Sequence, residues 1–147
     1  MVIFKTGISK KERIKILGIV TEFTDIYRDF YLTKNNLRLF IRDNLDILFK
    51  DLRKGDKIAY DENGVGLVVG YSDKAKRKYI KLLAKDSKSA DRLIKVILWN
   101  EKIDLWAKIK RNSIFKSVLE RNNFRFEANR GKEILLVRRA KKEYKHD

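Results

Sequence analysis

The chain has 147 residues, of which 44% are hydrophobic, and a formal net charge of +16. This length fits one domain with a single core, and the hydrophobic share is too high for a disordered chain. There is no cysteine and only one histidine, His146. Disulfides, thiolate zinc sites and cysteine nucleophiles are therefore excluded, and we expect no metal site.

No apolar run approaches the ~18 residues that a membrane-spanning helix requires. Residues 1–7 lack the apolar stretch of a secretory signal. We therefore expect a soluble, cytoplasmic domain without a membrane partner. Lys and Arg are spread along the chain, and a surface this basic attracts polyanions such as nucleic acid. The same charge would suit a polyphosphorylated ligand, so charge alone does not choose between them.

The N-terminal third predicts a strand followed by helices. Residues 2–5 form a short apolar strand, and Ser9 and Glu12 have the spacing of a capping box before a helix over 10–22. Thr33 or Asn35 can begin a helix through residue 41, and a second apolar set at 45–52 ends at Lys54-Gly55.

The middle of the chain has the alternating pattern of strands. Asn63-Gly64 separates apolar runs at 57–60 and 65–71, which is a strong signal for a hairpin. A further strand is predicted over 78–85. Three strands in succession favour an antiparallel meander.

The C-terminal half predicts two further helices and three strands. Apolar residues from Ala90 to Leu98 follow helical spacing, with Ser87 or Ser89 as the N-cap, and a strand covers 103–110. Asn112 or Ser113 can begin the helix that carries Ile114, Phe115, Val118 and Leu119. Strands at 124–127 and 133–138 form a hairpin across Asn129-Arg130-Gly131.

The predicted order is β-α-α-β-β-β-α-β-α-β-β. A strand–helix–strand crossover over 78–110 implies local parallel pairing inside a mixed sheet. The fold class is therefore α/β (α+β), a mixed central sheet flanked by helices. We expect one domain over residues 1–140 and a basic tail over 141–147.

This order resembles the GCN5-related N-acetyltransferase (GNAT) superfamily over nearly the whole chain. The most specific part runs from Asn112 to Phe124, which is similar to the family's Asn, helix and Gly-Phe before its penultimate strand. Asn123 stands where the family usually has glycine. Asparagine also tolerates positive φ, so this difference is mild.

The resemblance implies an acyl-CoA whose pyrophosphate binds the turn between the fourth strand and the next helix. Backbone amides at a helix N-terminus hold such an anion. Lys85 keeps the basic first position and Ala90 the last, whereas Lys88 replaces the central glycine. An ordinary helix start is the alternative. The implied cofactor-binding residues are Leu83, Lys85, Ser87, Lys88, Ser89, Ala90 and Asn112.

The resemblance also implies a tyrosine on the last helix that protonates the leaving thiolate. Leu119 occupies that position, and it has no titratable proton. Tyr60, Tyr71 and Tyr79 are substitutes, although a strand tyrosine commonly only packs. The base could be Glu22, Asp61, Glu62 or Asp73. The catalytic residues therefore stay unassigned.

A basic cluster precedes and enters the fourth strand. Tyr79 lies within it, and Trp106 and Lys108 on a neighbouring strand can share its face. Cations beside an aromatic ring are what phosphate contacts and base stacking require, and a solvated lysine-rich turn is the alternative. The candidate nucleic-acid residues are Lys74, Lys76, Arg77, Lys78, Lys81, Trp106 and Lys108.

Two functions follow. The first is a GNAT-like N-acyltransferase that moves an acyl group from acetyl-CoA or another acyl-CoA to an amine acceptor. The alternative is a non-catalytic protein of this fold whose basic surface binds nucleic acid or a nucleic-acid-associated protein; an acidic protein is a further candidate partner. The Lys/Ile/Asn-rich, proline-free composition also suits a factor from a phage or other mobile element. Lys88 in place of the central glycine and Leu119 in place of the tyrosine keep the enzyme and the binding protein both open.

Overall fold

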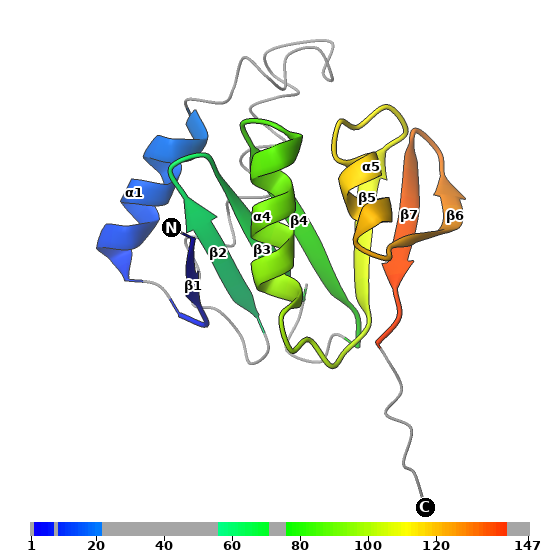
Figure 1. The fold of residues 1–147 in the computed structure, drawn as a ribbon, viewed down its shortest axis with the longest axis horizontal. Helices are drawn as coiled ribbons and strands as arrows, with labels where there is room; N and C mark the ends of the chain where they lie inside the picture. The colour runs from blue at the N-terminus through cyan, green and yellow to red at the C-terminus, as the bar shows by residue number, and fades with distance from the viewer. Residues whose placement is uncertain (1, 8, 22–55, 71–75, 141–147) are drawn as a thin grey trace, which may run out of the picture.

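The computed structural model describes residues 2–7, 9–21, 56–70 and 76–140 (Figure 1). The described helices are α1 (Lys10–Thr21), α4 (Ser87–Leu98) and α5 (Lys116–Arg121). The described strands are β1 (Ile3–Lys5), β2 (Lys57–Asp61), β3 (Gly64–Val69), β4 (Lys78–Ala84), β5 (Leu105–Lys110), β6 (Arg125–Arg130) and β7 (Glu133–Arg138).

These strands form one mixed sheet with the order β1-β2-β3-β4-β5-β7-β6. Only β4 and β5 pair in parallel, and the other neighbours are antiparallel. The predicted fold class, meander and crossover are thus confirmed. The helices predicted within 33–52 and the tail at 141–147 lie outside the described residues. Within the described part, no helix is long and apolar enough to cross a membrane.

One face of the sheet is covered by α4 and α5, which lie side by side in Figure 1. The buried stripe of α4 includes Leu93 and Ile97, as its spacing predicted. A Cβ on Gly66 of β3 would lie 2.6 Å from Ile97 Cδ1, so the glycine lets α4 approach the sheet. Lys57 of β2 donates to the carbonyl of Ile97 and pairs with Glu101, at the negative end of α4.

The opposite face of β1 and β2 is in contact with α1. Side chains alternate along a strand, so Lys5 and Tyr60 point away from the face that carries Lys57. Glu12 of α1 accepts hydrogen bonds from Lys5 Nζ at 2.7 Å and from the Tyr60 hydroxyl at 2.9 Å. Ser9 completes the predicted capping box by accepting from the Glu12 amide at 3.2 Å.

The predicted first hairpin is present, but it turns at Glu62-Asn63, one residue before the predicted Asn63-Gly64, because Gly64 already pairs with Asp61 as the first residue of β3. A Cβ on Gly64 would lie 2.6 Å from the backbone oxygen of Leu83, so only glycine permits this approach of β3 to β4. The second hairpin turns at Gly131-Lys132, and not across Asn129-Arg130-Gly131 as predicted. Its β6 strand extends to Arg130, and Gly131 takes a φ of 65° in the turn.

The helix α5 is shorter than predicted, because Ile114 and Phe115 precede it. Its end matches the prediction: Asn123 has a φ of 71°. The amide of Asn123 bonds to the carbonyl of Glu120, and the amide of Phe124 bonds to that of Leu119. These two bonds form a Schellman motif with asparagine at the left-handed position.

Stability at low pH should depend on Glu12. Hydrogen bonds from Lys5 and then Tyr60 lower the pKa of Glu12 from 4.5 to about 2. A carboxylate with a lower pKa in the folded state stabilises it fully above the unfolded pKa, and this stabilisation is lost as pH falls. Between pH 4.5 and about 2, we expect the free energy of unfolding to fall more steeply in wild type than in Glu12→Gln. Urea unfolding across this range measures both slopes. Glu120→Gln, at an exposed position, is the control, and equal slopes for wild type and Glu12→Gln would contradict the assignment.

A second prediction concerns the left-handed residue after α5. Asn123→Ala should lower the free energy of unfolding by about 1 kcal/mol, because a Cβ without a local hydrogen-bonding group is disfavoured at positive φ. Asn123→Gly should preserve or raise it. Urea unfolding of the two variants provides the test, and equal stability of Ala and Gly would show that the backbone conformation does not set the preference.

Candidate functional site

The strands β4 and β5 are paired only at their beginnings. The parallel register consists of Lys78↔Leu105 and Tyr79↔Trp106, although β4 continues to Ala84 and β5 to Lys110. The outer neighbours β3 and β7 remain paired along these same stretches. The two strands therefore form a fork, which is closed at Tyr79 and Trp106 and opens toward the N-terminus of α4.

The open end of the fork lies at the turn between β4 and α4. This is the turn for which the family resemblance implies pyrophosphate binding. The N-cap of α4 is Asp86, not Ser87 or Ser89 as predicted. The Asp86 carboxylate accepts from the Ser89 amide at 2.8 Å, and this bond lowers the pKa of Asp86. The first amides of a helix have no intrahelical acceptor. With the Ser89 amide engaged, those of Ser87 and Lys88 are the ones that can face an anion.

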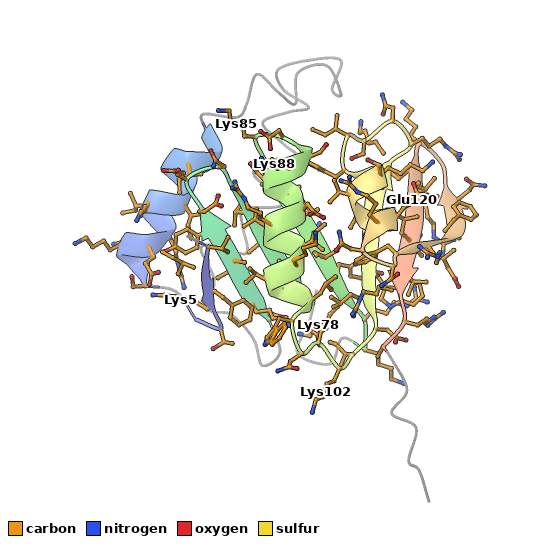
Figure 2. All side chains as sticks on the ribbon, in the orientation of Figure 1. Lys5, Lys78, Lys85, Lys88, Lys102 and Glu120 are labelled. Atoms are coloured by element: carbon orange, nitrogen blue, oxygen red, sulfur yellow. The ribbon has the colours of Figure 1, made fainter. Side chains whose placement is uncertain are left out.

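Both signs of charge surround this helix start. Lys85 and Lys88 are exposed, and Figure 2 labels them at the end of the sheet opposite Lys78. Arg92, one turn along α4, lies 3.9 Å from Asp61. The turn therefore presents cations to a phosphate, while the Asp86 carboxylate opposes it.

The other implied cofactor residues differ in exposure. Leu83 and Ala90 are buried in the core, and Ser89 is 3% exposed. Ser87 donates its hydroxyl to the carbonyl of Ile114 at 3.3 Å, which links the α4 turn to the segment before α5. Asn112 is exposed in that segment. Among the implied cofactor-binding residues, Ser87 and Lys88 are the ones whose backbone amides can donate to a ligand.

The tyrosine candidates are separated by the structure. Leu119 is buried in the core, so α5 supplies no proton donor at that position. Tyr60 is 2% exposed and donates to Glu12, and burial raises its pKa, so it does not serve as the acid of an open site. Tyr79 lies at the closed end of the fork. Tyr71 lies outside the described residues, as do the base candidates Glu22 and Asp73.

The remaining base candidates lie in the first hairpin. Asp61 accepts from the Asn63 amide at 2.7 Å, which is the bond of an Asx turn, and its side chain is 8% exposed. Glu62 is exposed. A structural role therefore accounts for Asp61, and the catalytic residues stay unassigned. Within the described residues, no cluster of ligating side chains could hold a metal ion.

The basic residues predicted to contact nucleic acid divide between two faces of the sheet. Lys78 forms an ion pair with Asp56 at 2.6 Å, and both side chains are largely buried. By register, Lys81 and Lys108 point to the opposite face, which carries Trp106, as the sequence had suggested for Lys108. Lys76 is exposed, and Lys74 lies outside the described residues. Lys78 is therefore engaged in the fold and does not extend the basic surface.

Arg77 and Trp106 belong to one predicted cluster, but no pattern in the sequence indicates that they are in contact. The Arg77 guanidinium lies 3.9 Å from the centroid of the Trp106 ring, and Trp106 is only 6% exposed. A nucleic-acid base could not stack on this ring while Arg77 covers it. The contact follows from the strand register, because Tyr79, two positions after Arg77, pairs with Trp106.

No family model matches the chain, and no curated protein matches it. Solved structures do. A crystal structure of the PaiA N-acetyltransferase of Thermoplasma acidophilum in complex with coenzyme A covers 95% of this chain and 99% of that chain, with a TM-score of 0.67 and 13% identity. A structure of Campylobacter jejuni N-acetyltransferase PseH in complex with acetyl coenzyme A covers 95% of this chain and 99% of that one, with a TM-score of 0.52 and 17% identity.

A GNAT-family acetyltransferase from Listeria monocytogenes covers 94% of both chains, with a TM-score of 0.58 and 11% identity. The chain therefore has the fold of these GNAT N-acetyltransferases, which confirms the resemblance in fold seen in the sequence. These identities are low, so the likeness is one of fold.

Proposed function

We propose that the chain is an N-acyltransferase that uses an acyl-CoA and an amine acceptor. The observation that carries this proposal is the fork between β4 and β5, whose parallel pairing ends at Tyr79 and Trp106. A gap in sheet pairing lets an extended chain such as the pantetheine arm run beside strand backbone. The polar groups of this arm would form hydrogen bonds with the backbone donors and acceptors of β4 that do not pair with β5.

The start of α4 suits the diphosphate of such a ligand in part. The backbone amides of Ser87 and Lys88, and the ammonium groups of Lys85 and Lys88, would hold its negative charge. The Asp86 carboxylate already accepts the Ser89 amide and would repel the diphosphate. The residues present therefore fit the group, with one opposing charge.

An acyl-CoA supplies a thioester, whose carbonyl carbon accepts the acceptor's amine. The new C–N bond forms as the C–S bond breaks; the amine loses a proton and the thiolate gains one. The fork would hold the two reactants in line, and such positioning supplies much of the acceleration in a direct transfer. Among the tyrosines within the described residues, Tyr79 lies at the closed end of the fork and could deliver this proton to the thiolate.

Ligand binding tests the proposal directly. Acetyl-CoA and desulfo-CoA should raise the melting temperature, because a ligand selective for the folded state stabilises it. Adenosine is the control, since it lacks both the diphosphate and the pantetheine arm. No shift at millimolar acetyl-CoA would overturn the proposal.

Removing the opposing charge should tighten this binding. Asp86→Asn keeps a side chain that can cap α4 while removing the negative charge. We expect the Kd for acetyl-CoA to fall about three- to tenfold, as for one like-charge contact near the surface. Isothermal titration provides the measurement.

The matched control for Asp86→Asn is Asp104→Asn. Asp104 also accepts a backbone amide, from Ala140 at 2.7 Å, but it lies beside the beginning of β5, at the closed end of the fork. Its substitution should leave the Kd unchanged. Equal effects of both substitutions would indicate general charge attraction, and an unchanged Kd in Asp86→Asn would place the diphosphate elsewhere.

A further inference from the structure

The closed end of the fork carries an arginine that is held in place by an aromatic ring. The Arg77 guanidinium stacks on Trp106 at 3.9 Å from the ring centroid, and Arg77 is exposed. Trp106 itself is fixed in a small cluster with Leu135 and Val137. A stacked guanidinium has lost part of its rotational freedom while its N–H edges still point outward.

The basic side chains near Arg77 differ from it in having carboxylate partners. Arg139, which lies 5.1 Å from the same ring, also pairs with Asp104 at 3.1 Å and lies 3.8 Å from Glu127. Lys108 lies 3.9 Å from Glu133. Within the described ranges, by contrast, the Arg77 guanidinium has no hydrogen bond and no carboxylate partner.

The position of Arg77 relates it to the reacting end of the proposed ligand. Trp106 is the last residue of β5 that pairs with β4 before the strands diverge. The start of α4 lies at the other end of β4, about 20 Å away by strand rise. If the diphosphate binds at α4, the acyl group of an extended arm lies nearer the Trp106 end.

We infer that Arg77, supported by Trp106, binds an anionic group of the acceptor amine, either a carboxylate or a phosphate. This inference rests on the proposed acyltransferase function and names its acceptor class. The planar guanidinium can form two parallel N–H···O bonds to either anion. Because Trp106 restricts the guanidinium, less conformational entropy is lost when the anion binds. Arg77 is then a specificity-determining residue, since it acts on a part of the acceptor that does not react.

The geometry favours a small anionic acceptor over a nucleic acid. Base stacking would need the Trp106 ring that Arg77 covers. Lys78, the next residue in the basic run, is paired with Asp56. The other guanidinium near this ring, Arg139, is paired with Asp104, so within the described residues Arg77 offers the unpaired guanidinium here, which suits one anionic group.

Kinetics with three matched amines test the inference. Ethanolamine, β-alanine and O-phosphoethanolamine share an aminoethyl group and end in a hydroxyl, a carboxylate and a phosphate. With acetyl-CoA as donor and thiol release as the readout, one of the two anionic amines should have a KM at least about tenfold below that of ethanolamine. The amine with the lower KM identifies the anion.

Substitution of Arg77 should remove this preference alone. Arg77→Gln should raise the KM of the preferred anionic amine about tenfold, and the KM values of ethanolamine and acetyl-CoA should stay unchanged. Arg130→Gln is the matched control, since Arg130 is an exposed arginine on β6. A preference that survives Arg77→Gln, or no preference in wild type, would overturn the inference.

A binding measurement separates failure of the inference from failure of the proposed function. The chain has two tryptophans, and Trp99 is 79% exposed, so Trp99→Phe leaves Trp106 as the only tryptophan reporter. Titration with β-alanine or O-phosphoethanolamine should change Trp106 emission in this background. Adding Arg77→Gln should abolish the change, whereas adding Arg130→Gln should not.

The outcomes of the titration are distinct. An Arg77-dependent change without any acetyl transfer would support the anion site and contradict the acyltransferase. A response to a single-stranded oligonucleotide, with none to either small anion, would overturn the inference in favour of nucleic-acid binding. Transfer to all three amines with equal KM would overturn the inference while supporting the acyltransferase.

Discussion

The short parallel pairing between β4 and β5 is the constraint on which the site depends. Six register pairs join β3 to β4 and six join β5 to β7, whereas two join β4 to β5. The flanking strands therefore hold the two arms of the fork apart. Tyr79 and Trp106 fix its closed end, and the N-terminus of α4 lies at its open end. A displacement of either arm would change both the gap and the position of Arg77 relative to it.

Much of the fold could be predicted because its signals are local. Asn63-Gly64 specified a hairpin, the apolar stripe from Ala90 specified α4, and Asn123 took the left-handed conformation expected at a glycine position. The length of pairing between β4 and β5 could not be predicted. Side-chain alternation along β4 is the same whether β5 follows it for two residues or for six. The fork is set by tertiary packing, so no local pattern encodes it.

The site was harder to predict for related reasons. Asp86, Ser87 and Ser89 are all good N-cap residues, and their order in the sequence does not select one. Neighbouring residues of a strand face opposite sides of the sheet, so a basic run does not form one surface. Lys78 forms an ion pair with Asp56, which lies 22 positions earlier in the chain. Only the register shows that Arg77 meets Trp106 instead.

The cap of α4 has a consequence for how this turn would respond to ligand. Because Asp86 already satisfies the Ser89 amide, the loop can adopt its shape with an internal anion and needs no external one. An incoming diphosphate would then bind beside a tethered carboxylate that repels it. Occupancy would consequently be sensitive to ionic strength and would rise under acidic conditions, once that carboxylate became neutral.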